Sequence, residues 1–486
     1  MTKLKQGAQL VAQGIKTMFG YHAVLDKNRR TPPKSITKSE DKHLDKTSRK
    51  KLISTARDNR RNQALLAWMI RKHIDYVATF NFQSNSGDRV FDREMESIMS
   101  WFARPENFDI AGRHGLSEFL RLVEGHRVVD GDIGVLLTRN GKLQGIEGDR
   151  IAKPTKGAMP QLQGENVNDD LLTHGVIADQ YGGARWYVVC DRDGENLVFN
   201  RLVPARDMQM VGYWDRFDQV RGVSPLASAL NAITDFYEVV QYQNIKQKMG
   251  AMLGVAIMSD KVESSDPWGG IDADTGDSPT GSTTKYDFDL RPGLKLELQA
   301  GDKIDTIESK NPSMEFQSYN EFLIHVAMLS LDIPFTFFDS RKSSYSAQRQ
   351  DLLAYYESVQ RKRVQLVQLL DRITAWKMAR WVSEGLITLP GGQSLRDLKW
   401  KWLPPALPWI DPLKEINAYS VAVQNGFSSR QRIAGLMGGD FWDTLDQLAD
   451  EEKALVDSGV TVQLAQPGAI VTRDEEPDNP AEQQGI

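Results

Sequence analysis

The spacing of hydrophobic residues predicts helices in the first third of the chain. From Thr55 onward, apolar side chains recur every three or four residues, with arginines and lysines on the other faces. Residues 91–103 and 117–131 repeat this pattern. A stripe with this period places one apolar face of a helix against a core. We therefore expect three amphipathic helices, the first of which starts near Thr55.

Two other stretches alternate between apolar and polar residues, which indicates β-strands. Residues 132–148 alternate around an Asn-Gly pair at 140–141, and residues 184–204 alternate around an Asp-Gly pair at 193–194. Such pairs favour the two-residue turns of β-hairpins. Together with the helices, these hairpins predict an α+β body for residues 60–215.

Three longer helices are predicted further along. Ser224 is a suitable N-cap and Pro225 suits the first position of a helix that runs to Met249. A second helix, at 312–333, is followed directly by a proline that ends it. The third, at 347–387, keeps helical periodicity for about 38 residues, or near 57 Å. A helix of that length is typical of an element that spans an assembly.

The segments between and after these helices are predicted to be mainly loops and short helices. Residues 259–311 are rich in Gly, Ser, Thr, Asp and Pro, hold 12 acidic and six basic residues, and include an alternating strand pair. We expect an acidic insert that projects from its flanking helices. A short loop with aromatic and basic residues occupies 334–346. An aromatic, proline-rich crossing at 397–412 precedes two or three short helices at 417–459.

The net charge of −5 hides a gradient along the chain. Residues 3–72 hold 18 basic and five acidic residues, whereas residues 411–486 hold 14 acidic and five basic residues. Residues 1–54 are predicted to be a basic N-terminal arm, either extended or a disordered solubilising tail. Residues 466–486 are predicted to be an acidic flexible tail.

The cysteine and aromatic content limits the class of protein. The single Cys190 excludes a disulfide framework and a cysteine-based zinc site within one chain, and it fits a reducing compartment. With 11 Trp, 18 Phe and 13 Tyr the chain has ample material for a core. No apolar run approaches the roughly 20 residues that span a bilayer, so we expect no membrane partner. The N-terminus reads as an amphipathic start and not as a signal peptide.

No sequence motif indicates catalysis or a cofactor. The chain lacks a Walker phosphate loop, a dinucleotide-binding glycine motif, a zinc-protease motif and a nucleophile elbow. Its seven histidines are scattered, and His325 lies in an apolar helix, which favours a core or interface role. We therefore expect no catalytic residue, no cofactor and no metal site.

Two acidic stretches fit a metal site or a DNA-binding site poorly. Asp272, Asp274 and Asp277 lie in a loop without the remaining ligands of an EF-hand, which favours a solvated acidic loop. Residues 428–448 faintly resemble a helix-turn-helix, but their second helix carries aspartates and no base. A recognition helix that faces phosphates should not be that acidic.

Four stretches, in order, resemble the bacteriophage portal proteins and, within them, the lambda-like branch. Residues 219–226 are similar to the family's approach to its first stem helix, and 322–334 to its second stem helix with a terminal apolar-Pro break. Residues 342–346 resemble the exit from the tunnel loop, and 425–451 the C-terminal segment of this branch. The likeness extends over residues 55–460, and it rests on the order and spacing of short motifs.

The resemblance implies a mainly helical α+β portal fold and a non-enzymatic subunit of a ring, usually dodecameric, at one capsid vertex. The genome would be packaged and later ejected through this ring. It further implies the following regions: basic arm 1–54, wing 55–221, first stem helix 222–251, clip 252–311, second stem helix 312–333, tunnel loop 334–346, long helix and wing 347–399, crown 400–465 and tail 466–486.

The implied partners are copies of the chain itself, double-stranded DNA in the channel, the terminase large subunit, the head-to-tail connector, and the major capsid and scaffold proteins. The implied location is the virion, after assembly in the host cytoplasm. The candidate residues are Phe337, Phe338, Arg341, Lys342, Ser343 and Tyr345 in the tunnel loop, Lys246 and Lys248 in the stem, and Asp266, Trp268, Asp272, Asp274 and Asp277 in the clip.

Alternatives remain open at the level of the sequence. Arg341 and Lys342 either lie closest to DNA or pair with Asp332 or Asp339 at a subunit interface. The basic cluster at 361–363 is either a solvated face or an approach to phosphate. The chain as a whole could instead be a metal-dependent DNA-processing enzyme that uses its acidic insert, or a scaffold that binds nucleic acid through its basic arm.

Overall fold

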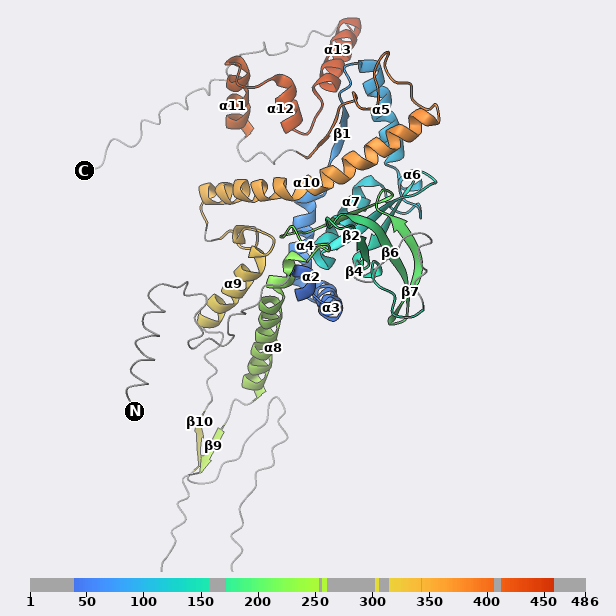
Figure 1. Cartoon of the computed structure of the whole chain (residues 1–486). Coiled ribbons are helices and arrows are strands. Elements are labelled where there is room, and N and C mark those ends of the chain that lie inside the picture. Colours follow the sequence, from blue (N-terminus) through green and yellow to red (C-terminus); the bar gives the residue numbers. More distant parts are fainter. Residues whose placement is uncertain are drawn as a thin grey trace, which may run out of the picture.

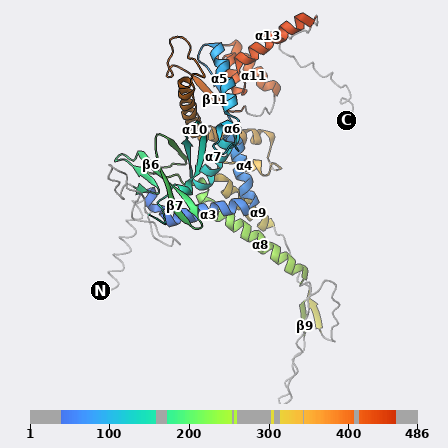
Figure 2. The same cartoon turned by 90° about the vertical axis from the view of Figure 1, so that its right-hand side faces the viewer.

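The computed structural model describes residues 39–157, 172–252, 256–259, 302–305, 314–341, 343–405 and 412–458. Figure 1 shows an elongated subunit in which the long helix α10 (Tyr345–Ser383) crosses between a mixed α/β body and a group of C-terminal helices. Two helices, α8 (Leu230–Met252) and α9 (Met314–Leu329), extend from the body on the other side. Figure 2 shows α8 continuing away from the sheets of the body.

The body begins with helices that start earlier than the sequence pattern predicts. Helix α2 (Glu40–His43) is followed by α3 (Lys46–Asn62), which is capped where Asp45 accepts a hydrogen bond from the Ser48 amide. Residues 46–54 were predicted to belong to an extended arm. They are helical because Arg49 and Ile53 on their inner face are buried against the body. A break at Gln63 then separates α3 from α4 (Ala64–Val77).

Both predicted hairpins are confirmed, and each is part of a larger sheet. In the first sheet the strand order is β3-β2-β8, and in the second it is β4-β5-β6-β7, with all pairs antiparallel. Gly141 and Gly194 occupy the turns at φ values of +82° and +60°, a region that favours glycine. The strands are β2 (Asp132–Leu137), β3 (Leu143–Glu147), β4 (Leu172–Thr173), β5 (Val176–Ala178), β6 (Ala184–Asp193), β7 (Asn196–Pro204) and β8 (Met208–Gly212).

A third pairing joins segments that are far apart in the sequence. Strand β1 (Asn81–Ser84) pairs antiparallel with β11 (Trp400–Leu403), and the rings of Phe82 and Trp402 pack with their centroids 5.1 Å apart. The proline-rich crossing therefore contributes a strand that ties the region after α10 back to the body. The body also contains α5 (Arg89–Phe102), α6 (Pro105–Phe108), α7 (Leu116–Asp130) and the 3₁₀ turn η2 (Gly148–Arg150).

The predicted long helices are present, with changes at two ends. The second was predicted to run to residue 333 and to be ended by Pro334, but α9 ends at Leu329, and Asp332 then turns the chain at a positive φ of +58°. Ser224 caps through its hydroxyl, which accepts from the Leu226 amide, but the first turn is a 3₁₀ helix, η4 (Pro225–Ser228). Strands β9 (Ala256–Ser259) and β10 (Asp302–Asp305) pair antiparallel. The remaining elements are η5 (Phe335–Phe337), α11 (Pro412–Gln424), α12 (Arg430–Leu436) and α13 (Phe441–Ser458).

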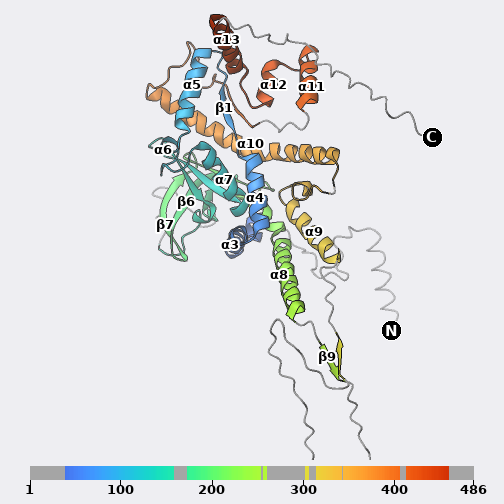
Figure 3. The same cartoon turned by 180° about the vertical axis from the view of Figure 1, so that it is seen from behind.

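The main core lies where α10 crosses α4, α5 and α7. Trp381 of α10 is buried and packs edge-on against Phe102 of α5, with ring centroids 5.7 Å apart. Figure 3 shows from behind that the first part of α10 extends sideways past α4 and over α9. The long helix thus joins the core of the body at one end to the top of α9 at the other.

A buried ion-pair cluster joins the body to the start of η4 and α8. The Asp132 carboxylate accepts hydrogen bonds from Nε and Nη2 of Arg221, both at 2.7 Å, from Nη2 of Arg49 at 2.9 Å and from the Gly222 amide at 2.8 Å. Burial alone would raise the pKa of Asp132, but the two guanidinium groups hold it below its ordinary value. The cluster therefore connects α3, β2 and the segment that leads into α8.

Glycine lets two backbones meet at this cluster. A Cβ on Gly222 would lie 2.2 Å from the carbonyl oxygen of Gly131, which no side chain can tolerate. Gly131 itself has φ +93°. The close approach of these two segments is what brings the Gly222 amide to Asp132.

Replacing Arg221 with Leu is predicted to destabilise the body strongly. The Asp132 carboxylate would stay buried with only one guanidinium partner, and breaking a buried pair in this way costs about 3–5 kcal/mol. The midpoint of urea unfolding, followed by tryptophan fluorescence, measures the change. Because folding depresses the pKa of Asp132, its ion pairs stabilise the protein fully above the ordinary carboxyl pKa. This stabilisation is lost as the pH falls through the pKa that Asp132 has in the folded protein.

Arg192→Leu is the matched control for this substitution. Arg192 also pairs with carboxylates, those of Glu147 and Asp149, but it is 43% exposed. Exposed pairs contribute about 0–1 kcal/mol. Equal losses of stability in the two variants would contradict the role given to the Asp132 cluster.

Candidate functional site

The segment 334–346 links α9 to α10, and its first residues are fixed by the body. Asp332 has φ +58°, a left-handed conformation that Asp tolerates better than most residues, and it reverses the chain after α9. Its carboxylate pairs with Lys362 Nζ at 2.8 Å and accepts from the Ser358 hydroxyl at 2.6 Å. Lys362 also donates to the Leu331 carbonyl at 2.6 Å. Helix α10 thus holds the start of the loop through polar contacts.

Aromatic rings hold the same part of the loop from the other side. Phe337 packs against Tyr76 of α4 and Tyr355 of α10, with centroid distances of 5.8 and 5.3 Å. Phe338 packs edge-on against Trp68 of α4 at 5.9 Å and is 47% exposed. The two phenylalanines were predicted as channel residues, and in the single chain they make packing contacts that anchor the loop.

Sequence analysis did not identify the partners of these phenylalanines. Trp68 and Tyr76 lie eight residues apart on one side of α4, and Tyr355 lies near the start of α10. Aromatic residues at helical spacing were the only signal available. They could be assigned to the loop only once the fold had brought α4, α10 and residues 335–338 together.

Arg341 at the tip of the loop pairs with an aspartate of the same chain. Arg341 donates from Nε and Nη2 to the Asp339 carboxylate at 2.9 and 2.7 Å, and its side chain is 80% exposed. Of the two carboxylates considered from the sequence, Asp339 is therefore the partner, within the same chain. Lys342 lies outside the described residues.

The remaining predicted loop residues lie at the start of α10. The Ser343 hydroxyl donates to the Ser340 carbonyl at 3.0 Å, and Ser344 caps the helix by accepting from the Ala347 amide. Tyr345 is 55% exposed. Ser343 therefore shapes the turn, whereas Tyr345 presents an aromatic ring to the surroundings of the loop.

Most of the basic cluster at 361–363 points into the protein. Lys362 makes the contacts to Asp332 and Leu331, and burial lowers its pKa although Asp332 opposes that effect. Arg363 is buried, donates to the Tyr76 carbonyl and lies 5.4 Å from the Tyr356 ring centroid. Only Arg361 of the three is exposed. The predicted alternatives of a solvated face or a phosphate contact therefore remain for Arg361 alone.

A buried network extends inward from Lys362. Arg127 of α7 donates to the Lys362 carbonyl at 3.0 Å and pairs with Glu124 at 2.7 Å. Glu124 in turn lies 2.7 Å from Nε2 of His73 on α4. Burial lowers the pKa of His73, against the opposing effect of Glu124. The start of the loop is thus linked through α10 to two helices of the body.

The predicted stem and clip residues can be placed only in part. Lys246 and Lys248 are exposed on α8, and neither has an ion pair among the described residues. The predicted clip residues lie outside the described part of the chain: Asp266, Trp268, Asp272, Asp274 and Asp277.

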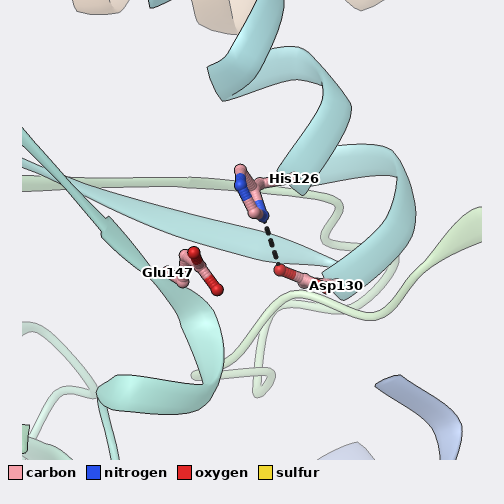
Figure 4. A group of neighbouring side chains, drawn as sticks. All are labelled: His126, Asp130 and Glu147. Atoms are coloured by element: carbon pink, nitrogen blue, oxygen red, sulfur yellow. Dashed lines mark hydrogen bonds and ion pairs between the residues drawn. The ribbon is translucent and has the colours of Figure 1, made fainter. Parts of the chain in front are cut away.

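One group of described side chains has the composition of a metal site. Ligand atoms of His126, Asp130 and Glu147 lie within 4.8 Å of one another. Figure 4 shows the hydrogen bond between His126 and Asp130, with Glu147 across from them. Nη2 of Arg57 already lies 2.6 Å from Asp130 and 3.0 Å from Glu147, and Arg192 lies 2.5 Å from Glu147. Two guanidinium groups therefore neutralise these carboxylates, which is typical of an ion-pair cluster.

Within the described ranges, no helix is long and apolar enough to cross a membrane. No curated protein matches the sequence of the chain. Chains in three solved structures are similar to it, each with a TM-score of 0.46 and each covering 80% of this chain and 93% of the other. The first belongs to the virion of a native gene transfer agent (GTA) particle and is 16% identical to this chain. The second belongs to the neck of a native GTA particle computed with C12 symmetry and is 14% identical. The third belongs to the neck of an empty GTA particle computed with C6 symmetry and is 16% identical.

The sequence of the chain also matches a protein family. The match is to the family described as phage portal protein, lambda family, and it covers residues 28–363. This range is more than two-thirds of the 486 residues and includes the body, α8, α9, the loop and the first half of α10. The chain therefore belongs to the lambda family of phage portal proteins.

Proposed function

We propose that this portal protein assembles as a closed ring, near twelve copies, at one vertex of the capsid. Double-stranded DNA passes through the ring during packaging by the terminase large subunit and again during ejection. The ring also contacts the major capsid and scaffold proteins and later binds the head-to-tail connector. It is assembled in the host cytoplasm and remains in the virion. The observation that supports this proposal is the family match, which spans α8, α9, the loop and the first half of α10.

We propose the regions as they were expected from the sequence, with one shift. The body is the wing, α8 and α9 are the stem, residues 252–311 are the clip, 334–346 the tunnel loop and the C-terminal helices the crown. The start of the wing moves from residue 55 to residue 39, because α3 buries Arg49 and Ile53 against the body. The basic arm is then residues 1–38, and its partner is either a neighbouring subunit, a capsid protein or nucleic acid.

The clip is proposed as the docking region for terminase and connector. It is acidic and lies in the sequence between the two proposed stem helices, and its two described strands, β9 and β10, lie beyond the end of α8 (Figure 1). Asp266, Trp268, Asp272, Asp274 and Asp277 are its proposed contact residues. An acidic surface of this kind fits a partner with a basic face.

The proposed role of the tunnel loop follows from its charge balance. A protein that neutralises many phosphates binds DNA tightly and in a salt-dependent way, which would oppose sliding. Arg341 is 80% exposed and pairs with Asp339, which is largely buried and compensates one of the two bases of the loop. Because its own side chain is exposed, Arg341 can reach a passing phosphate, and the loop carries few bases with which to hold it. Lys342, and in the stem Lys246 and Lys248, are proposed as the other bases near DNA.

Replacing both Arg341 and Lys342 with Ala is predicted to reduce the DNA retained per capsid. The loops would lose their bases, and with them their transient phosphate contacts. The measurement is DNA content per purified particle after packaging. Arg206→Ala combined with Lys156→Ala is the matched control, because Arg206 is also exposed and paired with a nearby aspartate, Asp207, but lies in the wing. Normal packaging and retention in the loop variant would contradict DNA contact by these two residues.

Replacing Phe337 with Ala is predicted to loosen the loop without preventing ring formation. Two aromatic contacts of about 0.5–1.5 kcal/mol each would be lost, so amide exchange in the loop should become about 10- to 100-fold faster. Hydrogen exchange on assembled rings measures the change, and DNA retention should fall with it. Tyr181→Ala removes a ring that is 87% exposed in the wing and should change neither quantity. Unchanged loop exchange in the Phe337 variant would refute the anchoring.

A further inference from the structure

The C-terminal helices lack a core of their own. Ile433 is the only residue with a buried side chain among the described side chains of α11, α12 and α13. Fixing the backbone of each residue costs conformational entropy, and burial of apolar surface normally offsets that cost. The large apolar side chains of this segment are mostly exposed instead: Leu413, Ile416, Val421, Phe427, Leu436, Met437, Trp442, Leu445, Leu448 and Val456.

Polar contacts attach these helices to the rest of the chain. Arg349 of α10 lies 3.6 Å from Glu415 of α11, and Arg93 of α5 pairs with Asp446 of α13. Exposed pairs of this kind add little stability. A group of exposed apolar side chains on such a segment marks an interaction surface.

The exposed faces of α12 and α13 are complementary. On α12, Arg432 and Leu436 are four residues apart, which places them on one face, and both are exposed. On α13, Leu448 and Glu452 have the same spacing and are also exposed. Neither Arg432 nor Glu452 has an ion pair among the described residues. An antiparallel approach of the two faces would match Arg432 with Glu452 and Leu436 with Leu448.

Within one chain, the side chains of Leu436 and Leu448 stay exposed. Asp446 is the last residue of α13 with a described contact to α5, and every side chain from Gln447 to Ala454 is exposed. Glu452 lies six residues beyond Asp446, or roughly 9 Å further along the helix. Figure 1 shows α13 at the edge of the molecule, away from α10. The face of α13 that carries Leu448 and Glu452 is therefore exposed to another copy.

We propose that α12 of each chain packs antiparallel on the outer half of α13 of the adjacent chain, with Arg432 paired with Glu452 and Leu436 packed on Leu448. This interface rests on the proposed ring. It is heterologous: each chain offers α12 to one neighbour and the outer half of α13 to the other, so that the contact repeats around the closed ring. DNA is not the occupant, because residues 411–486 hold 14 acidic and five basic residues. The C-terminal helices are then completed by assembly.

Disulfide trapping tests this contact directly. The full-length chain would carry Leu436→Cys and Leu448→Cys together, and its only native cysteine, Cys190, is buried. Mild oxidation of assembled rings should give a ladder of covalent oligomers on a non-reducing gel. Each single variant should stay uncrosslinked, because a heterologous contact never brings two equal positions together. A fast-migrating, internally crosslinked monomer, or rings without a ladder, would overturn the interface.

Charge exchange provides a second readout that does not depend on cysteine chemistry. Arg432→Glu should speed amide exchange in α12 and α13 of the ring, and adding Glu452→Arg should restore protection. Glu451→Arg combined with Arg432→Glu is the control and should not restore it, because residue 451 lies on another face of the helix. Failure of the Glu452 rescue in intact rings overturns the interface alone, whereas a wild-type chain that never forms rings refutes the proposed function.

Discussion

The buried Asp132 carboxylate is the interaction on which the arrangement of the subunit depends. It lies on the central strand of the first sheet and is held by Arg221, which precedes the stem, and by Arg49 of α3. Arg221 also donates to the carbonyls of Gly148 and Ile151, so that one guanidinium connects three backbone segments. Because a buried charge tolerates few alternative geometries, this cluster sets where α8 leaves the body.

A second set of contacts fixes the start of the loop relative to the body. Lys362 links the end of α9 to α10, and Arg127 and Glu124 link α10 to the helices of the body. The aromatic contacts of Phe337 add packing to the same place. The loop is thus held by packing where it leaves the body, and at its tip Asp339 compensates one of two bases. In the proposed channel, a loop with so few bases would brace the duplex without neutralising it.

Local patterns in the sequence predicted the local structure well. The hairpins at 140–141 and 193–194, the cap at Ser224 and the length of α10 follow from turn chemistry and periodicity, which act over a few residues. The pairing of β1 with β11 could not be predicted, because it depends on α10 bringing residues 81–84 and 400–403 together. Residues 46–54 of α3 were missed because their exposed lysines hide an inner face that includes Arg49. That residue is buried where it pairs with Asp132.

The same limit applies to the candidate site. The loop was located correctly between two helices, but whether Phe337 faced the channel or the body depended on Tyr76 and Tyr355, which are remote in sequence. Lys362 and Arg363 looked like a surface cluster because charge alone does not reveal which face of a helix is covered. The proposed contact residues of the clip lie outside the described residues, so they still rest on composition.

The central claim is that the chain works as a closed ring, and native mass spectrometry of the purified full-length protein tests it most directly. The account predicts one dominant species near twelve times the 54.8 kDa of the single chain. A stable monomer at the same concentration and ionic strength would contradict it.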